Sequence, residues 1–202
     1  MINSKQIENY KEPFYKRSFD VLFSIIFIIL SLPTFLLLAI LVKVESPGPI
    51  FYGNLRIGLN GKTFKLYKFR TMRLNASVIK TSAVWKLRND PRITRIGRLL
   101  RTTGLDEIPS LFNVLAGELS FVGPRPANPY EIEHYSSEQK LRLRIRPGLT
   151  GYWQVYGREN KLFDIEEMVK MDLKYAEKQS LWFDIKILWK TFSVGIHRRG
   201  AY

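Results

Sequence analysis

The strongest pattern in the chain is an uninterrupted apolar run near its N-terminus. Residues 21–42 contain no charged side chain over 22 positions, and a helix of that length reaches about 33 Å, enough to cross the hydrocarbon core of a bilayer. Ser31 and Pro33 lie in the middle of the run. Pro33 lacks a backbone donor, while the Ser31 hydroxyl can bond a freed backbone group. The pattern therefore predicts a membrane-embedded helix-break-helix with its break at Ser31 and Pro33.

Positive charge flanks both ends of this run. Lys16 and Arg17 precede it and Lys43 follows it, and basic residues beside membrane segments stay preferentially on the cytoplasmic side. We therefore expect a re-entrant segment that enters one leaflet, turns and returns. A kinked helix that spans the bilayer and a buried core helix are the alternatives. The chain accordingly divides into residues 1–45, an arm with the membrane segment, and residues 46–202, a compact domain at the cytoplasmic face.

Residues 46–202 show the patterns of a mainly α-helical domain with a small β element. Turn residues at 46–49 end the membrane segment, and residues 50–52 and 64–70 are expected to form two short strands around a turn at Gly58 and Gly61. Asp90 followed by Pro91 predicts the cap of a helix that runs to about Arg101. Between these patterns, residues 73–90 carry little signal.

Two more helices are predicted in the last third of the chain. In the first, after residue 160, Asp172 falls on a face that is otherwise apolar. We expect this carboxylate to pair with an arginine of the phosphate-binding site. The second has an apolar face made of Trp182, Ile185, Trp189, Phe192 and Ile196. Such a face suits an amphipathic helix in the membrane interface, and core packing is an equal alternative.

Basic residues are concentrated in one block. The chain carries a net charge of +14, and residues 46–104 hold 13 lysines and arginines against a single acid, Asp90. Four of these arginines recur at every third residue from Arg92 to Arg101 with no acid between them. A block of this kind attracts nucleic acids, anionic lipid head groups or phosphorylated substrates. For the arginine row we favour anion binding over a solvated face.

Several chemistries are excluded by composition and motif. The chain has no cysteine and only two histidines, His134 and His197. Disulfides, thiolate metal sites, a cysteine nucleophile and a histidine metal cluster are therefore ruled out. No glycine-rich phosphate loop of the Walker type or the dinucleotide-binding type occurs.

Asp106 and Glu107 stand together directly after the basic block. Their helix is expected to end at Gly117, with Pro109 in its first turn. On this segment alone, an N-cap and a first-turn acid explain the pair. The setting favours chemistry, because an aspartate that attacks a diphosphate meets like charge, at about 4 kcal/mol per unit pair at about 4 Å and a dielectric of about 20. Such a nucleophile needs a divalent cation and arginines, and Arg101 precedes the pair by five residues.

Two further segments are candidates for substrate binding. Arg125 lies between two prolines, whose fixed φ angles aim its guanidinium with little entropy lost on binding; a rigid turn is the alternative. Tyr152, Trp153 and Tyr156 could stack on a nucleobase or sugar, although core packing accounts for them better.

Together these segments resemble the bacterial sugar transferase family, the monotopic polyprenyl-phosphate phosphoglycosyltransferases. The matching motifs, in family order over nearly the whole chain, are Lys16-Arg17-x-Phe19-Asp20, Tyr67-Lys68-Phe69-Arg70-Thr71-Met72, Asp90-Pro91-Arg92-Ile93-Thr94-x-Ile96-Gly97, Leu105-Asp106-Glu107-x-Pro109-x-Leu111-x-Asn113-Val114, Val122-Gly123-Pro124-Arg125-Pro126, Arg146-Pro147-Gly148-Leu149-Thr150-Gly151, Gln154-Val155 and Gly157-Arg158. The set is specific, whereas no single motif is. Gly104 stands where serine is usual and Leu119 where methionine is usual, and residues 74–85 lack the acidic stretch of many relatives.

The resemblance implies a catalytic domain without the extra spanning helices of longer relatives, in the bacterial cytoplasmic membrane with its active site on the cytoplasmic face. It implies that Asp106 takes a phospho-sugar from a nucleoside diphosphate sugar, usually a UDP-sugar, and releases UMP. Polyprenyl (undecaprenyl) phosphate then attacks this covalent intermediate. The product would begin a surface glycan, such as an exopolysaccharide, capsule, O-antigen or glycoprotein glycan. Mg²⁺ is the implied cofactor, with Glu107 and Asp106 as its ligands.

The expected site can now be stated. Asp106 and Glu107 are the catalytic residues, and the residues expected to bind substrate phosphates are Lys68, Arg70, Arg101, Arg125, Arg146 and Arg158. The expected partners are a UDP-sugar, polyprenyl phosphate and the lipid bilayer, with no nucleic acid; a homo-oligomer is compatible with the sequence. Two other functions stay open. One is a basic membrane-surface protein that binds nucleic acid or anionic lipid without catalysis, which leaves the acid pair unexplained, and the other is a spanning enzyme that transfers the sugar alone and releases UDP.

Overall fold

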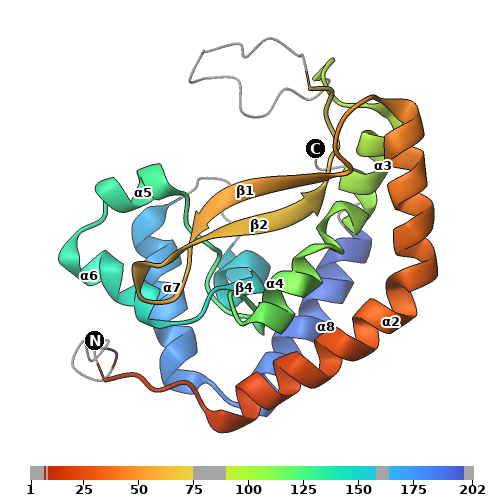
Figure 1. Cartoon of the computed structure of the whole chain (residues 1–202). Coiled ribbons are helices and arrows are strands. Elements are labelled where there is room, and N and C mark those ends of the chain that lie inside the picture. Colours follow the sequence, from red (N-terminus) through yellow and green to blue (C-terminus); the bar gives the residue numbers. More distant parts are fainter. Residues whose placement is uncertain (1–6, 8, 75–89, 158–163, 198–202) are drawn as a thin grey trace.

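The longest element of the structure is α2, a helix of 32 residues, Phe14–Glu45. This computed structural model describes residue 7 and residues 9–74, 90–157 and 164–197. Within that part of the chain, α2 is the one helix long and apolar enough to cross a membrane by length and composition. Figure 1 shows that α2 bends along its course and lies on the outside of the molecule, with the rest of the domain on its concave side.

Pro33 lies inside α2 without interrupting it. It cannot donate to the Ile29 carbonyl one turn earlier, and the neighbouring Ile28 carbonyl accepts a hydrogen bond from the Ser31 hydroxyl at 3.2 Å. The predicted break between two helices is therefore corrected. One helix continues through Ser31 and Pro33, because a single missing donor weakens the backbone ladder and permits a bend without ending the helix.

The remaining elements are short and follow one another closely. The other described α-helices are α3 (Arg95–Thr103), α4 (Ser110–Ala116), α5 (Pro129–Glu133), α6 (Ser137–Lys140), α7 (Ile165–Lys178) and α8 (Leu181–His197). The strands are β1 (Phe51–Ile57), β2 (Thr63–Phe69), β3 (Ser120–Val122) and β4 (Gly148–Thr150). Short 3-10 turns, η1 (Leu59–Gly61), η2 (Leu105–Glu107) and η3 (Leu141–Arg144), and a π-helical turn, η4 (Trp153–Gly157), connect them. The mainly helical class with a small β element is confirmed.

The N-terminal end of α2 is attached to the domain by buried polar contacts. The Lys16 ammonium is buried and lies 2.9 Å from the Asp184 carboxylate of α8. The Arg17 guanidinium donates to the carbonyls of Val114 and Leu115 near the end of α4, each at 2.7 Å. A cation is favoured at that helix terminus. The two basic residues before the apolar run therefore hold the helix in place as well as charging its end.

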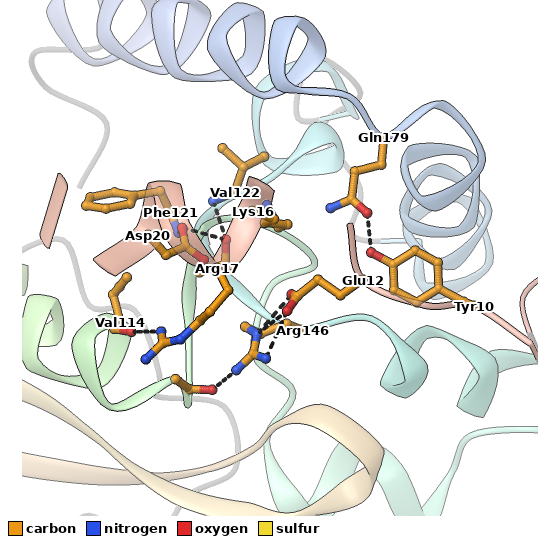
Figure 2. A network of polar contacts seen from close by, with 12 residues as sticks. Tyr10, Glu12, Lys16, Arg17, Asp20, Val114, Phe121, Val122, Arg146 and Gln179 are labelled. Atoms are coloured by element: carbon orange, nitrogen blue, oxygen red, sulfur yellow. Dashed lines mark hydrogen bonds and ion pairs between the residues drawn. The ribbon is translucent and has the colours of Figure 1, made fainter. Parts of the chain in front are cut away.

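Asp20, one turn further along α2, joins the helix to β3. Its carboxylate accepts hydrogen bonds from the Phe121 amide at 3.0 Å and from the Ser120 hydroxyl at 3.1 Å. Figure 2 shows Asp20 beside Lys16 and Arg17 in one network. Because a buried carboxylate without partners is costly, these bonds fix the helix against the strand.

The C-terminal end of α2 is attached to the same domain. The buried Arg70 guanidinium, at the end of β2, donates to the carbonyls of Ser46 at 2.6 Å and Pro47 at 2.8 Å. The Glu45 carboxylate accepts hydrogen bonds from the amides of Arg95 and Ile96 in the first turn of α3. Both ends of the apolar helix are thus held by one folded unit.

The predicted strands around Gly58 and Gly61 are confirmed. Strands β1 and β2 form an antiparallel hairpin in which Phe51 lies opposite Phe69. Phe64 is buried, whereas its neighbour Lys65 points to solvent. A second, parallel pair is formed by β3 and β4. Both small sheets contribute to the core together with α7 and α8; α8 packs against β3 and β4, and α7 packs against η3 and η4.

The aromatic residues at 152–156 belong mostly to this core. Trp153 is buried, and the Tyr152 ring lies 5.3 Å from the Phe183 ring and 5.1 Å from the Tyr156 ring. The interpretation as core packing is confirmed for Trp153 and Tyr152. Tyr156 keeps a substantial exposed fraction.

Asp172 is buried on α7 and pairs with an arginine, as its apolar surroundings predicted. The partner is Arg142, whose guanidinium donates to the Asp172 carboxylate at 2.7 and 2.9 Å and to the Tyr135 hydroxyl at 3.0 Å. Arg142 is not among the arginines expected to bind phosphate. The expectation that Asp172 supports one of those arginines is therefore wrong, because Arg142 is fully enclosed by this pair and its neighbours.

The apolar face of α8 points away from the core. Trp182, Trp189 and Phe192 are each about two-thirds or more exposed, while Ile187 on the opposite side is buried. Core packing is therefore excluded for these three residues. The side chain of Ile196 lies outside the described residues.

Replacing the buried Arg142 by methionine should destabilise the fold. Arg142→Met leaves Asp172 buried without its cation, which costs about 3–5 kcal/mol and lowers the melting temperature by about 10 °C in detergent micelles. Arg144→Met, at an exposed arginine two residues away, should change the free energy of unfolding by less than about 0.5 kcal/mol. Equal melting temperatures for the two variants would contradict the assignment of this pair as structural.

Candidate active site

Asp106 and Glu107 lie in the 3-10 turn η2, between α3 and α4. Gly104 ends α3 with a φ of 74°, in the left-handed region that glycine adopts without strain. The predicted helix from Asp106 to Gly117 is therefore corrected. Its α-helical part begins at Ser110, with Pro109 as the residue before it, and ends at the cap residue Gly117 as predicted. Asp106 makes no side-chain cap, so the N-cap explanation fails for Asp106, although both acids do lie in the first turn of η2.

The turn is held beside β2 by two residues of α4. The Asn113 side-chain amide donates to the Lys65 carbonyl at 2.8 Å and accepts from the Tyr67 backbone amide at 3.0 Å. Its side chain therefore makes the same two kinds of backbone hydrogen bond with β2 that a neighbouring strand would make. The Ser110 hydroxyl donates to the Tyr67 carbonyl at 2.8 Å. Both side chains are buried. They set the distance between the acid pair and Lys68, the next residue of β2.

In the part of the chain that the structure describes, Lys68 is the basic residue that forms ion pairs with both acids. Its ammonium lies 2.5 Å from a Glu107 carboxylate oxygen and 4.0 Å from an Asp106 carboxylate oxygen. The Asp106 side chain is 14% exposed and the Glu107 side chain 50% exposed. The two acids therefore differ in environment: Asp106 is largely withdrawn from water, and Glu107 is half-exposed to it.

Burial and the neighbouring charges act in opposite directions on the pKa of the Asp106 carboxyl. Burial raises its pKa above the usual value, and the Glu107 charge raises it further, whereas Lys68 and Arg101 lower it. A carboxylate held in such a place is poorly solvated, and it is stabilised by cations instead of water. This environment is typical of a nucleophile or a metal ligand and is found more often at functional sites than elsewhere.

Arg101, in the last turn of α3, lies close enough to this turn for its charge to lower the pKa of Asp106. The helix is capped by Thr94, whose hydroxyl accepts from the Gly97 amide, and not by Asp90 as predicted. Asp90 instead forms an ion pair with the Arg92 guanidinium at 2.6 Å, so Arg92 lies before the helix. Arg101 donates to the buried Thr71 hydroxyl at 2.9 Å.

The row of four arginines does not act as one surface. Arg92 is paired with Asp90, Arg95 and Arg98 are exposed, and Arg101 turns toward Thr71. Gly97 lets α3 approach the Thr71 backbone so closely that an added Cβ would lie 2.2 Å from the Thr71 carbonyl oxygen.

Arg125 is bound to another part of the domain. Its guanidinium lies 3.2 Å from both oxygens of Glu131 in α5, and its carbonyl accepts a hydrogen bond from Arg142 at 3.0 Å. The segment between the two prolines is thus braced from both sides. The ion pair with Glu131 orients the guanidinium that the sequence assigned to phosphate binding.

The other predicted phosphate ligands are not gathered at the acids. Arg70 is enclosed by carbonyls at the end of α2. Arg146 forms an ion pair with Glu12 at 2.9 Å and donates to the Gly117 carbonyl (Figure 2). Arg158 lies outside the described residues. Of the six basic residues expected at the site, the structure brings Lys68 and Arg101 to Asp106.

An apolar cleft beside Glu107 was missed from the sequence. It has a volume of about 470 Å³, and its walls are Phe19, Phe23, Phe27, Ser31, Glu107, Ile108, Leu111, Phe121 and Leu188. A signal existed, because the three phenylalanines of α2 recur at a spacing of four residues, which places them on one side of a helix. Thr71 and Asn113, which position Arg101 and the acid-bearing turn, were also missed as supporting residues.

Comparisons with known proteins identify the family of the chain. The model of the bacterial sugar transferase family matches residues 11–198. The chain belongs to this family. The exopolysaccharide production protein ExoY of Rhizobium meliloti is 43% identical over 200 residues, which cover 93% of this chain and 88% of that protein.

Longer relatives carry the same segment. The undecaprenyl-phosphate galactose phosphotransferase of Salmonella typhimurium is 44% identical over 202 residues, or 94% of this chain and 42% of that protein. The UDP-glucose:undecaprenyl-phosphate glucose-1-phosphate transferase of Escherichia coli K12 is 37% identical over 195 residues, or 93% of this chain and 41% of that protein. The chain thus spans less than half the length of these curated relatives.

Removing the Lys68 charge should raise the pKa of Asp106. In Lys68→Met the cation that favours the carboxylate is lost, so the pKa rises above its wild-type value. The pKa can be followed from the ¹³C shift of labelled aspartate carboxyls, with the Asp106 signal assigned by its loss in Asp106→Asn. Lys65→Met removes an exposed lysine from the opposite face of β2 and should leave this pKa unchanged. A pKa that stays constant in Lys68→Met would refute the coupling.

Proposed function

We propose that this protein transfers a phospho-sugar from a UDP-sugar to a polyprenyl phosphate and releases UMP, by way of a covalent intermediate on Asp106. The observation that carries the proposal is the environment of Asp106: a largely buried carboxylate with Lys68 and Arg101 near it and a second, half-exposed acid beside it. Family membership supports the proposal.

Two displacements at one phosphorus would complete the reaction. In the first, an Asp106 oxygen forms a bond to the phosphorus that carries the sugar. The bond from this phosphorus to the bridging oxygen breaks, and UMP leaves with the electron pair. In the second, an oxygen of the polyprenyl phosphate bonds to the same phosphorus, the bond from this phosphorus to the Asp106 oxygen breaks, and the electron pair returns to the Asp106 carboxylate. Lys68 and Arg101 would offset the repulsion between the carboxylate and the diphosphate, which is about 4 kcal/mol per charge pair at about 4 Å.

The acid pair fits Mg²⁺, which prefers oxygen ligands and keeps open positions for substrate phosphates. Within the described residues, no group of three or more acids, histidines or cysteines could hold a metal. Asp106 and Glu107 would therefore hold the ion together with substrate oxygens. When bound, Mg²⁺ would neutralise phosphate charge.

The names of the relatives support the substrate classes. Two of them name undecaprenyl phosphate as the carrier, and one of these names UDP-glucose as the donor. ExoY is named for exopolysaccharide production. Since the named sugars differ between relatives, galactose in one and glucose in another, we propose a UDP-sugar donor without choosing the sugar.

The attachment of α2 supports a re-entrant anchor in the bacterial cytoplasmic membrane. A straight helix of 32 residues would be about 48 Å long and could span a bilayer. Its two ends, however, bind the same domain, through Lys16 to α8 and through Arg70 to β2. One folded domain stays on one side of a membrane, so both ends would lie at the cytoplasmic face. The exposed tryptophans of α8 would lie in the interface beside it.

The reaction can be tested by the nucleotide that it releases. With UDP-glucose or UDP-galactose, Mg²⁺ and undecaprenyl phosphate, the wild type should release UMP and form a lipid-linked product. Asp106→Asn should lower this rate by about a thousandfold or more, because it removes the nucleophile. Asp164→Asn, at an exposed residue that still caps α7, should keep full activity. Release of UDP would indicate direct sugar transfer, and release of neither nucleotide would favour a non-catalytic basic protein.

The anchor can be tested with single cysteines, because the natural chain has none. Lys11→Cys places a cysteine before α2 in the chain, and Lys62→Cys places one after it, in the turn between β1 and β2. In a re-entrant arrangement, a membrane-impermeant maleimide should label both only after the cytoplasmic membrane is permeabilised. Leu32→Cys, in the middle of the helix, should stay unlabelled in intact cells. Labelling of Leu32→Cys, or of one flanking position alone, from outside intact cells would refute the arrangement.

A further inference from the structure

The apolar cleft beside Glu107 has one polar end. Phe19, Phe23, Phe27 and Ser31 follow one another at four-residue spacing along one side of α2 and form one wall. The opposite wall comes from η2, α4, β3 and α8. Ser31 and Glu107 are its two polar lining residues. With about 470 Å³, the cleft lies within the size range of sites for small apolar ligands.

The direction of α4 shows where the polar end lies. Arg17, near the start of α2, reaches the carbonyl of Leu115 near the end of α4. Phe35, further along α2, has its ring 6.0 Å from that of Phe112 near the start of α4. The first half of α2 and α4 are therefore antiparallel, and Glu107, which precedes α4, lies at the Ser31 end of the wall. The cleft runs from the acid pair toward Phe19.

The surface around the cleft is apolar on the outside as well. Leu22, Ile26 and Leu30, neighbours of the three phenylalanines on α2, are all exposed. An exposed apolar surface of this kind marks contact with lipid or with another protein. On the re-entrant anchor proposed above, it faces the bilayer, so the cleft is continuous with the surface from which a membrane-dissolved substrate would arrive.

The second displacement restricts what can occupy the cleft. It requires an acceptor phosphate at the phosphorus held on Asp106, and that phosphate is covalently attached to its hydrocarbon chain. The chain must leave the site along an apolar path. We propose that this cleft binds the isoprene units next to the phosphate of the polyprenyl phosphate acceptor, with Phe23, Phe27 and Leu111 against the chain. This inference rests on the proposed function and assigns the residues that recognise its acceptor.

The two half-reactions separate this role from catalysis. Exchange of labelled UMP into the UDP-sugar needs only the first displacement, whereas glycolipid formation needs both. Phe27→Ala removes part of the cleft wall from a side chain that is already half-exposed, so the fold should tolerate it. We expect UMP exchange within about twofold of the wild-type rate and a KM for undecaprenyl phosphate raised about tenfold, as the loss of one apolar contact surface predicts.

A matched variant on α2 controls for general effects on membrane binding. Ile26→Ala shortens an exposed apolar residue that does not line the cleft, and it should leave both half-reactions unchanged. Equal KM values in Phe27→Ala and Ile26→Ala would overturn the inference. If the wild type itself fails to exchange UMP, the proposed function fails first, so the two failures are distinguishable.

A photocrosslinker placed at position 27 identifies the occupant directly. With p-benzoylphenylalanine at this position, in vesicles of phosphatidylethanolamine, phosphatidylglycerol and undecaprenyl phosphate, irradiation should give an adduct with the mass of the prenyl phosphate. Added short-chain prenyl phosphate should compete with it. An adduct formed with phospholipid alone, and unaffected by the competitor, would show that the cleft is an ordinary lipid contact and would contradict the assignment.

Discussion

The burial of the Asp106 carboxylate beside a second acid is the constraint on which the rest of the site depends. Such a group is stable only if positive charge replaces the water that it has lost. Lys68 supplies this charge from β2 and Arg101 supplies it from α3. Each is placed by a structural device: Asn113 and Ser110 attach the turn to β2, and the close approach at Gly97 brings Arg101 to Thr71. The mixed charge of the site is therefore a property of the fold and of no single motif.

Helix α2, the proposed membrane anchor, is attached at both ends to the domain that carries this site. It is attached at its start by Lys16, Arg17 and Asp20 and at its end by Arg70. Any tilt of the helix in a bilayer would move α3, α4 and α8 with it, because these elements hold its two ends. The same helix forms the aromatic wall of the cleft that begins at Glu107. The apolar helix, the apolar cleft and the acid pair thus belong to one packed unit.

The sequence predicted the local features and missed most long-range partners. The hairpin, the apolar helix, the acid pair and the two basic residues nearest to it, Lys68 and Arg101, follow from periodicity, charge and motif order. The roles of Arg70 and Arg146 could not be predicted. The sequence does not distinguish an arginine that binds backbone carbonyls of a distant segment from one that binds a phosphate. Arg142 was overlooked because its burial depends on Asp172 and Tyr135, which lie 30 and 7 residues away in the chain. Thr94 caps the helix in place of Asp90 because α3 begins only at Arg95, and Asp90 pairs with Arg92 instead.

The covalent intermediate on Asp106 is the central claim, and intact mass spectrometry tests it most directly. The purified protein in detergent is incubated with UDP-glucose or UDP-galactose and Mg²⁺ without acceptor, then quenched in acid. The account predicts a protein species heavier by one sugar phosphate, located on Asp106 by peptide mapping, absent in Asp106→Asn and discharged when undecaprenyl phosphate is added. Glycolipid formation by a wild-type protein that never acquires this mass, or an adduct that persists in Asp106→Asn, would contradict it.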